Sequence, residues 1–366
     1  MRIPMNFNAG PASLPLAALE RAKSELLDFA GTGISVMEHS HRGKQYEAVH
    51  DEAIGLLREL LAIPNEYEVL VLQGGASLEF ATIPMNFLPP GASADHIVTG
   101  AWSEKAHAEA TAWAAVAGAK VRVAASTKET GYTRVARAEE AQIDETAAYV
   151  HFASNETIHG VQYADLPRFG NAPLVCDMSS DFLSRKVDIS AFSLIYGGAQ
   201  KNIGPSGVTV VIARSDFIDR GRRDLPAILQ YRAHAKANSL LNTPPTFGVY
   251  LMRNVLAWLK DEGGLEAIER RNRAKADELY GVLGALNGFY RCPVQPESRS
   301  VMNVVFRLSN EDMEKRFLAE AEKNAMIGLK GHRSVGGIRA SLYNAVEPAW
   351  VSALASFMKE FARRSG

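Results

Sequence analysis

The stretch SLIYGGAQKNIGPSG, residues 193–207, decides how this chain is interpreted. It is apolar up to Tyr196, two glycines follow, and Lys201 then stands alone before a further turn of glycine, proline and serine. Such a run predicts a buried strand that opens into a loop. A lysine in a partly buried cleft must pair, lose its proton or react, because an unpaired ammonium is costly there. Schiff-base formation with an aldehyde is one resolution, and an ordinary lysine in a surface turn is the alternative.

Short runs rich in valine, isoleucine and aromatic residues lie on both sides of this stretch, and several are apolar on both faces. Strands are predicted at 67–77, 96–102, 120–126, 147–154, 172–180, 192–201 and 207–214. Amphipathic helices are predicted at 15–31, 44–63, 78–88 and 103–118. Apolar strands that alternate with helices predict an α/β fold with a largely parallel sheet.

The last third of the chain has a different texture. A long charged helix is predicted at 265–286. It is followed by a strand at 300–308, a helix at 311–324, a turn with a second strand at 331–343 and a last helix at 348–364. This pattern predicts an α+β layer, so we place a boundary near residue 260. Residues 1–260 would form a large domain with an N-terminal arm, and residues 261–366 a smaller C-terminal α+β domain.

Composition excludes several classes of protein. The formal net charge of the 366 residues is −1, which gives no electrostatic reason to expect nucleic acid or an anionic membrane as a partner. The two cysteines, Cys176 and Cys292, lack the spacing of a zinc site, so we expect no metal and two reduced thiols. The N-terminus lacks the pattern of a signal peptide, and no apolar run approaches the roughly 20 residues of a membrane span. We therefore expect a cytoplasmic protein.

Chemically interesting residues follow the ends of the predicted strands, where open α/β sheets bind ligands. Asp177 could hold the protonated ring nitrogen of a pyridine cofactor, or it could be a turn aspartate. Trp102 could stack on a flat ring or belong to the core. The run QGGAS at 73–77 could offer backbone N–H groups to a phosphate, although an ordinary strand–helix turn fits equally well.

Two basic clusters complete the pattern. They lie at 40–44 and 329–341, and their side chains include His41, Arg42, Lys44, Lys330, His332, Arg333 and Arg339. Arginine binds carboxylates and phosphates with a planar fork of donors, so the clusters predict a substrate with two or three anionic groups. Solvated basic loops are the alternative.

Several motifs occur in a characteristic order: SVMEHSHRGK, GGAS, GAW, NET, CDMSS, YGGAQKNIGPSG, NTPPTF and KGHRSVGGIRASLYNA. Together they resemble the phosphoserine aminotransferase family, class V aminotransferases that depend on pyridoxal 5'-phosphate. The resemblance spans essentially the whole chain. It implies the fold type I of such transferases, the aspartate-aminotransferase-like fold.

The resemblance also implies roles for individual residues. Lys201 would carry the cofactor as an internal aldimine and move the proton, and Asp177 would pair with the ring nitrogen. The remaining cofactor contacts would come from Ala76, Ser77, Trp102, Thr157, Gln200, Asn242 and Thr243, the last two lent by the second subunit of a homodimer. Arg339 would bind the substrate α-carboxylate, and His41, Arg42, His332 and Arg333 the distal phosphate or γ-carboxylate. Some family members have an arginine where this chain has Ala76 and Ser77, so phosphate binding could differ.

The implied reaction is a ping-pong transamination between L-glutamate and 3-phosphohydroxypyruvate, which gives O-phospho-L-serine and 2-oxoglutarate in serine biosynthesis. A phosphorylated hydroxythreonine of pyridoxine biosynthesis is a further possible substrate. Sister enzymes such as an alanine–glyoxylate aminotransferase would not need the second basic cluster, and a cysteine desulfurase would need a mobile cysteine. A dinucleotide-dependent oxidoreductase should show GxGxxG, which is missing. A non-catalytic binding protein would not need a lysine, an aspartate and a tryptophan at three strand ends.

Overall fold

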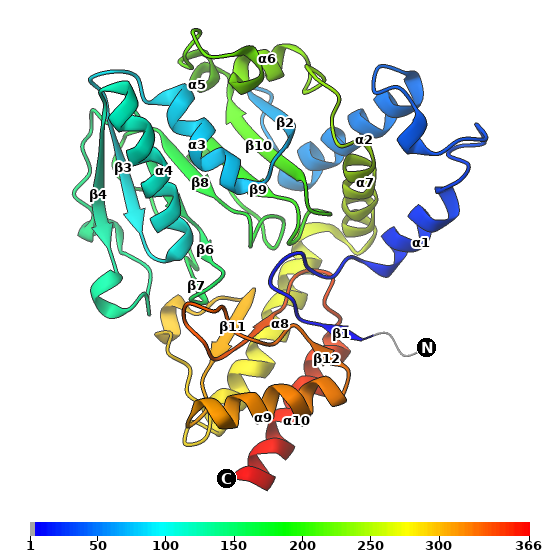
Figure 1. The fold of residues 1–366 in the computed structure, drawn as a ribbon, viewed down its shortest axis with the longest axis vertical. Coiled ribbons are helices and arrows are strands. Elements are labelled where there is room, and N and C mark those ends of the chain that lie inside the picture. Colours follow the sequence, from blue (N-terminus) through cyan, green and yellow to red (C-terminus); the bar gives the residue numbers. More distant parts are fainter. Residues whose placement is uncertain (1–3) are drawn as a thin grey trace.

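The computed structural model describes residues 4–366, and a seven-stranded sheet forms its centre (Figure 1). The strand order is β2-β10-β9-β8-β5-β3-β4. The strands are β2 (Tyr67–Gln73), β3 (Ser93–Val98), β4 (Lys120–Ser126), β5 (Val150–Ala153), β8 (Leu174–Asp177), β9 (Leu194–Gly198) and β10 (Val208–Arg214). Strand β10 runs antiparallel to β2 and β9, and the other six strands all run in one direction. This arrangement confirms the predicted, mostly parallel α/β sheet.

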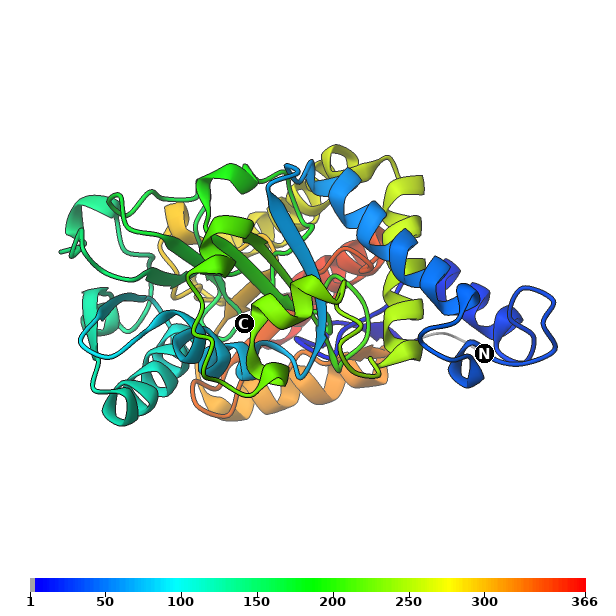
Figure 2. The same cartoon turned by 90° about the horizontal axis from the view of Figure 1, so that it is seen from above.

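Helices cover both faces of the sheet because its strands are apolar on both sides. In β10, for example, Val210 and Ile212 belong to one hydrophobic core and Val211 to the other. Helices α2 (Lys44–Leu61) and α7 (Thr246–Asp261) pack on the first core, with α1 (Leu16–Glu25) against α7. The second core is covered by α3 (Ala76–Phe87), α4 (Ala101–Ala117), α5 (Ser215–Asp219) and α6 (Tyr231–Lys236). Figure 2 shows the sheet between these two layers.

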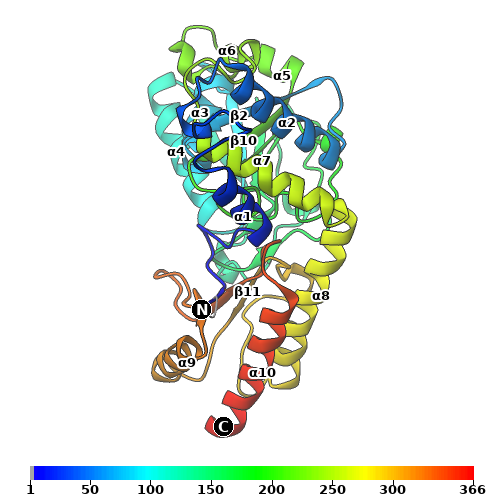
Figure 3. The same ribbon diagram turned by 90° about the vertical axis from the view of Figure 1, so that its right-hand side faces the viewer.

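The C-terminal part has its own core. It contains α8 (Gly264–Ala285), β11 (Asn303–Phe306), α9 (Glu311–Lys323), β12 (Met326–Ile327), β13 (Ile338–Ser341) and α10 (Pro348–Ser365). Strand β11 pairs antiparallel with β13, while β12 pairs with β1 (Met5–Asn6) from the start of the chain. The predicted boundary near residue 260 falls at the end of α7, and Figure 3 shows α8, α9 and α10 below the sheet. The division into two domains stays a prediction.

Several predicted elements differ in their bounds from those observed; the strand predicted at 192–201, for example, spans Leu194–Gly198. The strand predicted at 96–102 ends at Val98, and Trp102 lies in the first turn of α4. The first helix stops at Glu25 rather than near Gly31, where polar side chains such as Asp28 bind backbone N–H groups and favour turns. The strand predicted within 331–343 shortens to β13, because residues 331–337 form a loop. Within residues 4–366, no helix combines the length and the apolar character that a bilayer crossing requires.

Candidate active site

Six strands of the sheet run in the same direction and end at one edge, which faces the C-terminal part of the molecule (Figure 1). Asp177 is the last residue of β8, Thr157 follows β5, and Lys201 follows β9. The Lys201 Nζ lies 5.4 Å from the centre of the Trp102 indole, on the helix after β3. The structure therefore brings together the side chains that the sequence placed at strand ends.

Lys201 is the most constrained of these side chains. It is buried, and its Nζ donates a hydrogen bond of 2.7 Å to Thr157 Oγ1. Burial lowers the pKa of Lys201 to about 8, although the nearby carboxylates of Asp177 and Glu156 raise it in part. A large fraction of this amine is therefore neutral just above neutral pH, as a nucleophilic or proton-transferring lysine requires.

Asp177 is a buried carboxylate with one oxygen engaged. Its Oδ1 accepts hydrogen bonds from the Ser179 N–H at 2.8 Å and from the Ser179 hydroxyl at 2.6 Å. Burial raises the pKa of Asp177, and the positive charge of Lys201 opposes that shift. Within residues 4–366, no side chain or N–H group donates to Oδ2, so this oxygen can accept a ring N–H.

Glu156 fixes the start of the helix that carries Trp102. Its carboxylate accepts the Trp102 N–H at 2.9 Å and the Ser103 N–H at 2.8 Å, as an N-terminal cap does. Only a glycine fits at position 100, because a Cβ there would lie 2.4 Å from Glu156 Cδ. Among the described residues, the buried Trp102 Nε1 has no hydrogen-bond partner.

The start of α3 offers free backbone donors. Gly74 and Gly75 have positive φ, and their N–H groups bind Gly207 O and Thr209 Oγ1. The next two N–H groups, of Ala76 and Ser77, find no acceptor in the part of the chain that the structure describes. Two unpaired amides at the N-terminus of a twelve-residue helix suit a phosphate.

Arg339 lies on β13, across the edge from the sheet. Its Nη1 donates to Thr157 O at 3.3 Å, so Thr157 contacts both Arg339 and Lys201. Within residues 4–366, Arg339 pairs with no carboxylate, and its buried Nε has no acceptor. Burial lowers the pKa of Arg339, which marks a partly desolvated cation that an anionic ligand would satisfy.

Comparison with known proteins assigns this geometry to one family. The model of the aminotransferase class-V family matches residues 5–354. A phosphoserine aminotransferase of Geobacillus kaustophilus (strain HTA426) is 53% identical over 366 residues, which cover 100% of this chain and 99% of the relative. The chain belongs to the phosphoserine aminotransferases.

Solved structures of phosphoserine aminotransferases have the same fold. The enzyme from Bacillus circulans subsp. alkalophilus superposes with a TM-score of 0.96 at 50% identity, with 99% of both chains covered. A second structure, which concerns radiation damage of the Schiff base in a phosphoserine aminotransferase, gives 0.97 at 50% identity over 100% of both chains. The predicted fold class is therefore confirmed.

The loop 331–337 of this phosphoserine aminotransferase brings His332 to the mouth of the site. The positive charges of Arg339, Arg333 and Lys105 act with burial to lower the pKa of His332, so these cations lie near one another. Nδ1 of His332 lies 2.7 Å from the Ser334 hydroxyl and 3.3 Å from the Ser334 N–H. His332 and Arg333 of the second basic cluster therefore lie near Arg339, and their contact with a substrate stays a prediction.

Four predicted residues do not join this site within one chain. His41 and Arg42 lie in the loop between α1 and α2, at the outer end of the molecule in Figure 2, beyond α7. The Asn242 side chain donates to Gln73 Oε1 at 3.4 Å and to Thr243 O, near the start of α3 but apart from Lys201. The resemblance lends Asn242 and Thr243 to the cofactor of a second subunit, and the contacts of all four residues with the site stay predictions.

Gln200 adjoins Lys201, and its carbonyl accepts the Ala12 N–H at 2.9 Å. Its side chain packs beside Gly198 and Gly10, where a Cβ would meet it at 2.5 Å and 3.6 Å. The structure shows no protein partner for its amide among residues 4–366, so its predicted cofactor contact stays a prediction.

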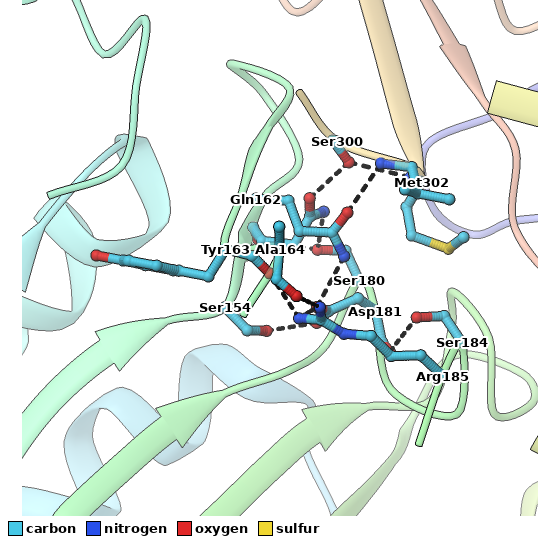
Figure 4. A network of polar contacts seen from close by, with 12 residues as sticks. Ser154, Gln162, Tyr163, Ala164, Ser180, Asp181, Ser184, Arg185, Ser300 and Met302 are labelled. Carbon is cyan, nitrogen blue, oxygen red and sulfur yellow. Dashed lines mark hydrogen bonds and ion pairs between the residues drawn. The ribbon is translucent and has the colours of Figure 1, made fainter. Parts of the chain in front are cut away.

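A buried polar network, drawn in Figure 4, supports the hairpin of β6 (Asn155–Glu156) and β7 (Val161–Gln162). Thr157 lies between these two strands in the sequence. Asp181 accepts hydrogen bonds from Ser154 and from Gln162, the latter at 3.0 Å. The Asn155 amide contacts Ser180, Ser300 and Asn303, so the network reaches the strand β11 of the C-terminal part. Because β11 pairs with β13, this network holds Thr157 in place relative to Arg339 on β13.

Sequence reasoning missed two residues of the site, Glu156 and Lys105. Lys105 Nζ lies 4.4 Å from the centre of the Trp102 ring, three positions along the same helix. A helix start assigned at Ala101 would have revealed this pair, since residues i and i+3 share a face. No sequence signal marked Glu156 as the cap of a helix that begins more than fifty residues earlier.

Proposed function

We propose that this aminotransferase transfers the amino group of L-glutamate to 3-phosphohydroxypyruvate with pyridoxal 5'-phosphate as its cofactor. The products are 2-oxoglutarate and O-phospho-L-serine, a step of serine biosynthesis. One cluster of side chains carries the proposal. The buried Lys201, whose pKa is lowered, contacts Thr157 and lies near Asp177 and Trp102. Arg339 beside it pairs with no carboxylate within residues 4–366.

The residues present fit the cofactor. The unpaired amides of Ala76 and Ser77 suit its phosphate, and the free Oδ2 of Asp177 suits the N–H of its ring. Trp102 offers an indole face, and Lys201 would hold the cofactor covalently. Thr157 and Gln200 would supply side-chain contacts. When bound, pyridoxal phosphate supplies an electron sink for the charge that develops at the substrate α-carbon.

The side chains of the chain then share the remaining work. When it is not bonded to the cofactor, the Lys201 amine would remove the proton from the substrate α-carbon and deliver it to the cofactor rather than back to the α-carbon. An amine with a pKa of about 8 can both accept and donate a proton near neutral pH. Arg339 binds the α-carboxylate with its fork of donors. His332 and Arg333 would bind the distal anionic group, which is a carboxylate in glutamate and a phosphate in phosphoserine.

The proposal includes a homodimer. Leu16, Leu27 and Met37 are exposed by 55%, 83% and 51%, and they lie on α1 and on the segment that follows it. Such a group of exposed apolar side chains is typical of an interface. A second copy that covers it would carry His41 and Arg42 towards the neighbouring site, and Asn242 and Thr243 towards the neighbouring cofactor phosphate. The free thiols suit the cytoplasm, where we propose that the enzyme acts.

The visible absorption spectrum of the purified enzyme tests the proposal. We expect a band from the lysine-bound cofactor that disappears when O-phospho-L-serine is added. A band that ignores phosphoserine and responds to another amino acid would move the activity to a sister aminotransferase. No band after incubation with pyridoxal phosphate would refute the cofactor. Phosphorylated 4-hydroxy-L-threonine, added in parallel, tests a second role in pyridoxine biosynthesis.

A further inference from the structure

Loop 331–337 has an anchor outside the catalytic residues. The Arg307 Nη1 donates a hydrogen bond of 2.7 Å to the carbonyl of Val335, inside the loop. The Arg307 Nε donates a hydrogen bond of 2.7 Å to Glu314 Oε1 on α9. The Glu314 side chain is only 8% exposed, so its carboxylate holds Arg307 in a fixed position. One arginine thus connects a buried carboxylate with the loop that carries His332 and Arg333.

The shape of the loop depends on this arginine. Gly336 and Gly337 have positive φ, and they pass directly over the Arg307 side chain. A Cβ on Gly337 would lie 2.5 Å from Arg307 Cδ, so only glycine allows this approach. At the base of the loop, the Gly331 N–H donates to Gly337 O at 2.8 Å, and the Arg339 N–H then donates to Leu329 O.

The loop has few other supports. Its remaining hydrogen bonds are internal: the N–H groups of Val335 and Gly336 donate to His332 O, and Ser334 contacts the His332 ring. Apart from the hydrogen bonds at its base, the loop is tied to the rest of residues 4–366 through Arg307. Loss of the guanidinium should therefore release His332 and Arg333 while Arg339 stays on β13.

We propose that Arg307, held by Glu314, is a positioning residue for recognition of the distal anionic group of the substrate. It touches neither cofactor nor substrate; it sets where His332 and Arg333 stand. This inference rests on the proposed function, because it assumes a substrate with an anionic group beyond the α-carboxylate.

The test compares two amino donors on Arg307→Met, which keeps the aliphatic stem. O-phospho-L-serine has a distal phosphate and L-alanine has none, and each half-reaction is followed by the loss of the cofactor band. We expect the concentration for half-maximal rate to rise about ten-fold with phosphoserine, equivalent to one hydrogen bond to a charged group. With alanine we expect a change below about two-fold. Equal losses with both donors would overturn the inference.

Two control variants show whether the selective loss comes from the contact between Arg307 and the loop. Arg316 pairs with Glu320 on the same helix without reaching the loop, so Arg316→Ala should leave both half-reactions unchanged. Gly337→Ala disrupts the contact with Arg307 from the loop side and should reproduce the selective loss. This variant keeps the inference testable if Arg307→Met fails to fold. A wild-type enzyme that ignores phosphoserine would instead refute the proposed function.

A second readout does not depend on activity. The loop contains Arg333 and follows Lys330, so trypsin can cut it where it is mobile. We expect trypsin to cleave Arg307→Met at these residues several times faster than the wild type, as measured by mass spectrometry of the fragments. Equal cleavage of the two proteins would mean that Arg307 does not anchor the loop.

Discussion

At the scale of single residues, Lys201 meets two demands at once: it lies where water is scarce, and it loses its proton near neutral pH. We expect the cofactor-free enzyme to react with pyridoxal phosphate at a rate that rises with pH and levels off above about 8. A lysine in solvent would reach this plateau only near its ordinary pKa of about 10.4. The growth of the visible band between pH 6.5 and 10 measures the midpoint.

Asp177→Asn provides the matched comparison. Because the carboxylate raises the pKa of Lys201, its removal should move the midpoint to a lower pH. A midpoint that moves to a higher pH would show that the Asp177 carboxylate does not raise the pKa of Lys201.

Glu156 allows a second prediction for a single residue. Glu156→Gln keeps the shape of the side chain but places an amide against the N–H groups of Trp102 and Ser103. We expect a loss of about 1–3 kcal/mol in the free energy of unfolding, because a buried, charge-assisted cap is broken. Denaturant titration measures this loss, and the fluorescence of Trp102 should shift with it.

The exposed Glu129, substituted by glutamine, is the control for Glu156. We expect a change within about 0.5 kcal/mol there. Equal stability of the Glu156→Gln protein and the wild type would mean that the cap is dispensable.

Single residues were also where the sequence was most informative. The positions of Lys201 and Asp177 at strand ends could be predicted, because a charged residue at the end of an apolar strand is visible in the sequence. Arg307 and Glu156 could not, since each acts through a contact with a segment far away along the chain. Nothing in the sequence around Arg307 or Glu156 indicates these contacts, which form only in the folded chain.

At the scale of elements, two strands were predicted almost to the residue, and the strand predicted at 207–214 spans Val208–Arg214. The strand at 120–126 has the predicted bounds. The strand predicted at 96–102 was too long, because Glu156 starts a helix where the local sequence continues to favour a strand. Boundaries that depend on a distant cap cannot be predicted from local propensity.

Helix α8 supports one prediction at this scale. The buried Lys275 donates to the carbonyls of Leu342, Tyr343 and Val346, at 2.8, 2.8 and 3.1 Å, and thereby holds the segment after β13. Lys275→Met fills the same space without donors, so three acceptors lose their partner. We expect a loss of at least about 3 kcal/mol in the free energy of unfolding, measured by denaturant titration.

The exposed Lys359 on α10 gives the matched substitution for Lys275. Lys359→Met should change the free energy of unfolding by less than about 0.5 kcal/mol. If Lys275→Met changes the free energy of unfolding equally little, the prediction is wrong, and water must replace Lys275 as the donor to the three carbonyls.

At the scale of the whole molecule, the exposed apolar residues on and after α1 form the surface through which we propose that two copies meet. Leu27→Asp should weaken the proposed dimer, because a carboxylate would replace a side chain that is 83% exposed in the single chain. We expect a shift towards monomer in light scattering and a parallel loss of activity, since His41 and Arg42 would no longer reach the neighbouring site.

Val116→Asp is the control for Leu27→Asp, because Val116 is 80% exposed but lies on α4, away from α1. A dimer that survives Leu27→Asp would place the interface elsewhere. The sequence could not predict this surface, since only the folded chain shows which apolar residues stay uncovered.

The start of the chain has a practical consequence for protein engineering. Strand β1 pairs with β12, and Met5 and Phe7 lie in the C-terminal core, although α1 packs on the α/β part. Gly10, in the segment between β1 and α1, lies beside the Lys201 side chain. A chimaera that joins this catalytic half to the C-terminal region of a sister enzyme at residue 260 would thus combine β1 with a foreign neighbour. Successful recombination needs two crossover points, one of them within the first dozen residues.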